Sequence, residues 1–115
     1  MISVFLSPEF IKNNPNAIQA LAKQMIENPT NPLGVARQAE AIMKHDTFEQ
    51  LPRIKVPTLI IHGDVDRAIP VENAQIMASR LPNAEMIILK GKGHGLNIEG
   101  ITELNKAILN FLEKH

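Results

Sequence analysis

Apolar residues in the first half of the chain recur at the spacing of amphipathic helices. The apolar positions are Ile18, Leu21, Ala22, Met25 and Ile26 in one stripe and Val35, Ala39, Ile42 and Met43 in a second. Asn14-Pro15 and Asn31-Pro32 each offer a cap followed by proline in the first helical turn, and Asn28-Pro29 ends the first stripe. A shorter helical turn begins at Ser7. We therefore predict a helical layer over residues 8–45, with both stripes packed in a core.

The pattern changes near Pro52, where continuous apolar runs begin to alternate with one-sided stripes. The predicted elements are a strand over Thr58–Ile61, a helix over Val71–Leu81, a strand over Met86–Leu89 and a helix from Ile101 to the C-terminus. This β-α-β-α order predicts parallel strands joined by a right-handed crossover. The predicted fold class is α/β, with a helical part over residues 1–51 and an α/β part over residues 52–115.

The two predicted strands are too few to form a complete parallel sheet. Strands that are apolar on both faces need helices on both sides and further strands at their edges. Either Met1–Leu6 adds a strand, or other polypeptide completes the sheet. We favour the second explanation, with the missing part supplied by an N-terminal half or by a second copy in a homodimer.

Composition narrows the classes of function. Twelve basic and twelve acidic residues cancel, and Trp and Tyr are absent, so nothing indicates a nucleic-acid or membrane partner. The absence of cysteine excludes disulfides and a thiol nucleophile. The apolar run Met1–Leu6 is too short to span a membrane and lacks the features of a signal peptide. We expect a soluble, cytoplasmic protein.

Two loops at the predicted strand ends hold nearly all the side chains of chemical interest. The first loop, His62–Pro70, contains Asp66, and the second, Lys90–Gly95, contains His94. Because the carboxyl ends of neighbouring parallel strands meet at one edge, these two residues can come together. A carboxylate that binds one imidazole nitrogen leaves the other nitrogen free to act as a general base.

These segments resemble those of a known family, the α/β-hydrolases. Pro57 to Asp66, followed by Ile69-Pro70, resembles their strand-and-acid segment, and Gly93-His94 resembles their histidine loop, with Glu99 also fitting. The preceding helices are similar to the distal cap of the branch that holds lactonases, esterases and cofactor-free haloperoxidases. The resemblance implies a partial α/β-hydrolase fold in which Asp66 is the triad acid and His94 the triad base. It also implies hydrolysis of a small ester or lactone without a metal or organic cofactor.

The nucleophile of that family is absent from the sequence. It sits on a G-x-S-x-G elbow, but the serines here are Ser3, Ser7 and Ser79, and none has glycine two positions away on either side. We therefore expect a C-terminal fragment that is inactive alone. The alternative is a non-catalytic subunit that associates with an N-terminal partner chain or with itself.

Other readings of the two loops remain open. His62, Asp64, Asp66 and His94 could instead converge on zinc or manganese, although the hydrolase pattern explains them with fewer assumptions. We expect His62 to be structural, Asp64 to tie down its own loop, and Lys90 and Lys92 to be solvated.

Overall fold

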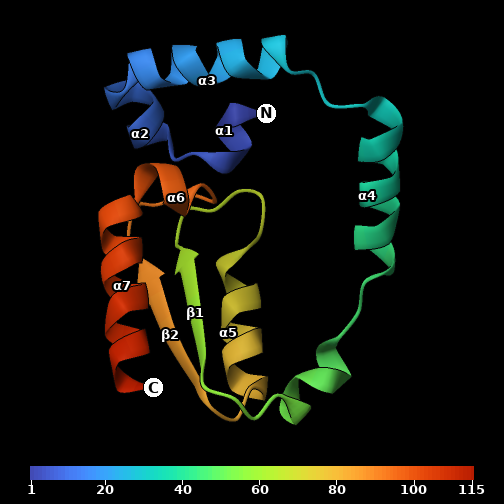
Figure 1. Cartoon of the computed structure of the whole chain (residues 1–115), viewed down its shortest axis with the longest axis vertical. Coiled ribbons are helices and arrows are strands. Elements are labelled where there is room, and N and C mark those ends of the chain that lie inside the picture. Colours follow the sequence, from blue (N-terminus) through green and yellow to red (C-terminus); the bar gives the residue numbers. More distant parts are fainter.

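The computed structural model describes all 115 residues and contains the predicted helices and strands in the predicted order, together with three short helical segments that were not predicted (Figure 1). The elements are α1 (Ile2–Phe5), α2 (Pro8–Asn13), α3 (Pro15–Glu27), α4 (Pro32–Lys44), η1 (Phe48–Arg53), β1 (Thr58–Gly63), α5 (Val71–Arg80), β2 (Ala84–Leu89), α6 (Leu96–Glu99) and α7 (Ile101–Lys114). Met1–Leu6 therefore adds no strand, because residues 2–5 form a helix. No helix is both long enough and apolar enough to cross a bilayer.

Polar side chains set the ends of the helices in the N-terminal half of the chain. The Ser7 hydroxyl accepts a hydrogen bond from Phe10 N–H at the start of α2. The Asn31 side chain accepts from the N–H groups of Leu33 and Gly34 in the first turn of α4. Asn14 differs from the prediction because its side chain makes no cap bond to α3. Its side-chain amide instead donates to Phe10 O in the last turns of α2, a carbonyl that also accepts from the backbone N–H of Asn14.

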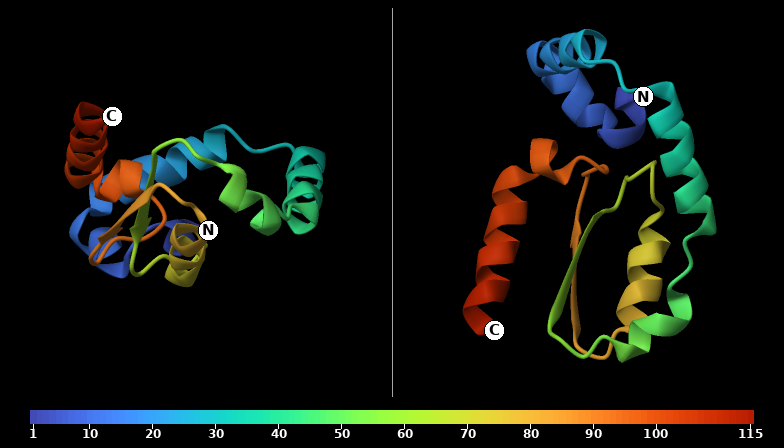
Figure 2. Two further views of the ribbon diagram at one scale, coloured as in Figure 1. Left: turned by 90° about the horizontal axis from the view of Figure 1, so that it is seen from below. Right: turned by 45° about the vertical axis from the view of Figure 1, so that its right-hand side comes forward.

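The two strands form a parallel sheet that lies between α5 and α7 (Figures 1 and 2). The register pairs Thr58 with Ala84 and Gly63 with Leu89, so both strands end at the same edge. On one face, Ile60 packs with Ala74 and Leu81 in a small buried cluster. This cluster anchors the crossover helix α5, and the strand ends beyond it carry the loops of interest.

The chain leaves much of its apolar surface uncovered. Its accessible surface is 8483 Å², whereas a folded monomer of this mass exposes about 6,300 Å². The radius of gyration is 16.3 Å, against about 13 Å for a closed domain of this length. Only 11 of 115 residues are buried, so these elements do not enclose a full core.

Helices α3 and α4 show where the core prediction was wrong, because neither contains a buried residue. Ile42 and Met43 are 72% and 86% exposed, although the helical spacing of their stripe is present. In Figures 1 and 2, α4 stands away from the sheet and its flanking helices. The apolar stripe is real, but this chain provides nothing for it to pack against.

The small cluster around Ile60 should dominate the stability of the α/β part. Ile60→Ala removes side-chain volume from a site that is 8% exposed and should lower the free energy of unfolding by about 2–4 kcal/mol. The matched change Ile26→Ala, at a side chain of α3 that is 78% exposed, should change it by less than about 0.5 kcal/mol. Urea denaturation followed by circular dichroism compares them, and equal losses would contradict the placement of the core.

Candidate active site

The site lies where the loops after β1 and β2 meet. Backbone hydrogen bonds join them, from Val65 N–H to Lys92 O (3.1 Å) and from Asp64 N–H to Leu89 O (3.3 Å). A Cβ on Gly63 would lie 2.1 Å from Lys92 O, so a side chain there would force the loops apart. The glycine at the end of β1 thus permits the close approach that the site needs.

Asp66 and His94, predicted to meet across 28 positions, are in direct contact. His94 Nδ1 lies 2.9 Å from Asp66 Oδ2, and because an ionised carboxylate only accepts, the imidazole donates. The side chain of Asp66 is 3% exposed and that of His94 is 43% exposed. The acid is therefore enclosed, while the histidine ring remains accessible with its Nε2 outside this hydrogen bond.

The environment of Asp66 stabilises its ionised form. Burial of the carboxyl group alone would raise its pKa, but hydrogen bonds from Ile69 N–H, His94 and Ala68 N–H outweigh that cost. The net result is a pKa of Asp66 below the ordinary value of 3.8. The two backbone donors, at 2.8 and 2.9 Å, both reach Oδ1. The other oxygen is left to face His94.

The remaining polar residues of the two loops do not form a metal site with Asp66 and His94. No group of three or more histidine or acidic side chains is arranged so that it could hold a metal ion. Asp64 accepts from Gly91 N–H (2.6 Å), so it ties the first loop to the second rather than to itself. His62 Nδ1 donates to Gly63 O (2.8 Å), while its Nε2 lies 3.6 Å from Asp66 Oδ2. His62 is thus held by its own strand end, behind the acid.

An apolar cavity of about 320 Å³ adjoins His94. It is lined by Ile2, Phe5, Leu6, Leu21, Met25, His94, Gly95, Asn97 and Ile98. The rings of Phe5 and His94 lie 5.3 Å apart between centroids, so an aromatic side chain borders the histidine directly. A second apolar hollow, of about 330 Å³, is bordered by Phe10, Ile18 and Leu21. Helical-layer side chains therefore wall space next to the histidine.

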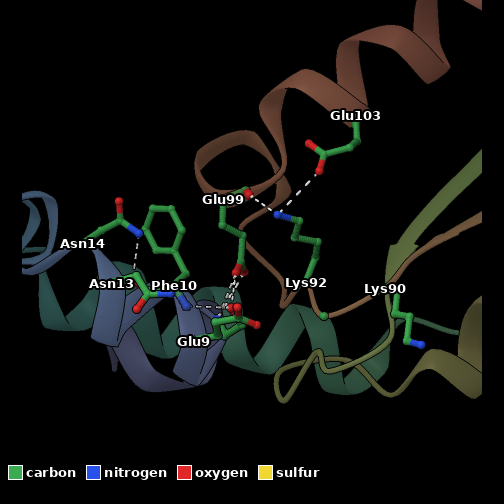
Figure 3. A pocket seen from close by; sticks show the side chains of 10 residues that line it. Glu9, Phe10, Asn13, Asn14, Lys90, Lys92, Glu99 and Glu103 are labelled. Atoms are coloured by element: carbon green, nitrogen blue, oxygen red, sulfur yellow. Dashed lines mark hydrogen bonds and ion pairs between the residues drawn. The ribbon is translucent and has the colours of Figure 1, made fainter.

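Glu99, which the sequence indicated only through a family resemblance, is buried beside the histidine loop. Its carboxylate accepts from the backbone and hydroxyl of Ser7 and from Gly93 N–H. Lys92 was expected to be solvated, but its ammonium group donates to Glu99 O (2.8 Å) and lies 3.6 Å from the Glu103 carboxylate. Lys92, Glu99 and Glu103 line a polar cavity of about 410 Å³. Figure 3 shows these three side chains together, with Lys90 directed away from them.

A comparison with known families decides where the chain belongs. A family profile described as TAP-like protein, Abhydrolase_4, matches residues 24–115. The chain belongs to the α/β-hydrolase family. The predicted partial α/β-hydrolase fold is thereby confirmed.

Individual α/β-hydrolase relatives match the chain over only part of their own length. A Synechocystis sp. protein that carries the name of a non-heme chloroperoxidase is 44% identical over 69 residues, 59% of this chain and 25% of the relative. The enol-lactonase from Burkholderia xenovorans LB400 is 25% identical, with a TM-score of 0.87 over 97% of this chain and 42% of its own. The α/β-hydrolase MGS-M2 from a Medee basin deep-sea metagenome library has a TM-score of 0.90 at 24% identity, over 98% and 42%. The chain spans less than half the length of each.

The lowered pKa of Asp66 predicts how acid affects this α/β-hydrolase chain. Asp66→Asn should reduce the free energy of unfolding at neutral pH by about 1–3 kcal/mol, because a buried, hydrogen-bonded carboxylate is lost. Since the pKa is lower in the folded than in the unfolded chain, this contribution is present above the unfolded value, about 3.9. The stabilising contribution of Asp66 disappears as the pH falls through the pKa that this residue has in the folded chain.

Urea denaturation between pH 7 and about pH 2 measures this loss. The difference between Asp66→Asn and the unaltered chain should shrink on acidification. Asp46→Asn is the matched control, because Asp46 is exposed and accepts only from Phe48 N–H. A difference that stays constant across the whole range would contradict the assignment.

Proposed function

We propose that this chain supplies the acid and the base of a serine hydrolase that acts on a small ester or lactone. In this proposal Asp66 is the triad acid, His94 is the general base, and the serine comes from polypeptide outside these 115 residues. The observation that carries the proposal is the 2.9 Å hydrogen bond between Asp66 Oδ2 and His94 Nδ1. It holds the ring in the tautomer whose Nε2 can accept a proton.

The reaction follows from that tautomer. Nε2 of His94 removes the hydroxyl proton from the serine while the serine oxygen bonds to the acyl carbon of the substrate. The resulting imidazolium is stabilised by the buried Asp66 carboxylate, and it returns the proton to the departing alkoxide as the C–O bond breaks. A water molecule then releases the acid from the acyl-enzyme by the same proton transfers, which regenerates the serine.

The apolar cavity supports a small, predominantly apolar substrate. Its walls come from the N-terminal segment, from α3 and from the region that follows His94. A volume of about 320 Å³ lies at the lower end of the range for small-molecule sites. The names of relatives agree with this class, since they include an enol-lactonase and an esterase from Exiguobacterium antarcticum.

The first test separates the chain from the completed enzyme. The 115-residue chain should neither hydrolyse p-nitrophenyl acetate nor be labelled by a serine-directed phosphonate, because none of its three serines lies on a G-x-S-x-G elbow. Joining to Met1 the part of the B. xenovorans enol-lactonase that this chain does not match should give a protein that does both.

In that chimera, His94→Ala and Asp66→Asn should each lower kcat by about 10³-fold or more, as in triads generally. His45→Ala is the matched control, because this exposed histidine lies at the end of α4 and should leave kcat within about twofold. Turnover that survives His94→Ala would overturn the proposal.

A second candidate function is supported by the uncovered surface. The chain exposes roughly 2,200 Å² more than a closed monomer of its mass, and stable interfaces bury about 800 Å² on each partner. We propose that, alone, the chain pairs with a second copy through the open sheet and the apolar stripe of α4. In that case its role is association, without turnover.

Sedimentation velocity tests this pairing. The chain should sediment as a dimer at micromolar concentration, and Met43→Glu on the exposed stripe of α4 should weaken dimerisation by about tenfold or more. Ala41→Glu adds the same charge to the opposite side of the same helix and should have little effect. A monomer at every concentration, or equal effects of both changes, would exclude this candidate.

A further inference from the structure

Glu99 is the most completely hydrogen-bonded acidic side chain of the site, and neither proposed function uses it. It is 7% exposed and lies at the end of α6, five positions after His94. A carboxylate at this depth is costly to keep unless donors surround it. Its partners therefore indicate what it does.

All the partners of the Glu99 carboxylate are donors from two distant segments. Ser7 N–H lies 3.2 Å from both oxygens, the Ser7 hydroxyl donates to Oε2, and Gly93 N–H donates to Oε1 at 2.8 Å. The Ser7 hydroxyl can give its proton to Glu99 because it accepts from Phe10 N–H with its lone pair. One carboxylate thus joins the first turn of α2 to the residue that precedes His94.

The histidine loop is in close contact with the same N-terminal segment on both sides of His94. A Cβ on Gly93 would lie 2.9 Å from Glu99 Oε1 and 3.0 Å from Phe5 O, and one on Gly95 would lie 2.6 Å from Leu6 Cδ2. Gly95 N–H also donates to Phe5 O at 2.7 Å. The backbone on either side of His94 therefore packs against residues 5–7, of which Leu6 and Ser7 are buried.

We propose that Glu99 is a positioning residue: it locks the loop of the general base to the base of the helical cap through Ser7 and Gly93. The role of His94 as general base rests on the proposed function, whereas the lock is a property of this chain alone. Movement of the cap segment would then change the orientation of His94 toward Asp66. A purely structural carboxylate would stabilise the chain without acting on that imidazole.

The variant Glu99→Gln tests the lock, because both oxygens accept and an amide can replace only one of them. At least one of the Ser7 and Gly93 donors then faces an NH₂ group. Ser7→Ala is a milder second variant that removes the hydroxyl but keeps the backbone donor. Glu103→Gln is the matched control, since this carboxylate contacts Lys92 on the same loop but not Gly93.

Hydrogen exchange and the imidazole signals of His94 are the readouts in the full 115-residue chain. In Glu99→Gln the amides of Gly93 and Gly95 should exchange about tenfold faster or more, with a smaller rise in Ser7→Ala and none in Glu103→Gln. The signal of the His94 Nδ1 proton should weaken or shift most in Glu99→Gln, less in Ser7→Ala and not at all in Glu103→Gln. If exchange rises equally in α7 and β2, or if the imidazole signals do not move, the positioning role is wrong.

The chimera with the enol-lactonase segment separates this inference from the proposed function. There, Glu99→Gln should lower kcat by about tenfold or more while KM stays within about twofold. If the unaltered chimera is inactive but Glu99→Gln still moves Gly93 and His94, the hydrolase proposal fails and the lock stands. If the chimera is active and Glu99→Gln matches Glu103→Gln in kcat and in exchange, the lock fails alone.

Discussion

The site depends on the contact between two backbone segments at one edge of a two-stranded sheet. Parallel pairing ends β1 and β2 together, and Gly63 allows Lys92 to approach where any side chain would obstruct it. Given that contact, the hydrogen bonds of Asp64 to Gly91 and of Asp66 to His94 follow from short side chains with little freedom. The geometry of the Asp66–His94 pair is therefore a consequence of strand register, with the small Ile60 cluster and the loop-to-loop bonds holding it in place.

Local patterns in the sequence predicted all the longer helices, both strands and the meeting of Asp66 with His94, but not the short helices α1, η1 and α6. Asn-Pro pairs and apolar spacing predict the cap helices, and continuous apolar runs predict the strands, because these signals act over a few residues. Asp66 and His94 could be paired because topology alone brings strand ends together. The partnership of Ser7 with Glu99 spans 92 positions, and no periodicity reports such a tertiary contact.

The errors in prediction have a common cause. A sequence pattern shows which structure a segment tends to form, but not which other part of the molecule it contacts. The α4 stripe is amphipathic, yet Met43 is exposed because nothing in these 115 residues covers it. Lys92 looks like a solvated loop charge, but the turn at Gly100 brings the carbonyl of Glu99 within its reach. Asn14 has the sequence of a cap for the next helix and instead closes the previous one.

The cavity beside His94 and the Asp66–His94 pair are built largely from different parts of the chain, and this separation has an evolutionary consequence. Most of the side chains around the hollow at His94 come from residues 2–25, whereas Asp66 and His94 belong to the loops of the sheet. In the proposed hydrolase, substrate selectivity can therefore diverge by exchange of the helical segment while Asp66 and His94 are left unaltered. Such an exchange must still present a backbone amide and a hydroxyl where Ser7 stands, so that the buried carboxylate is not left without partners.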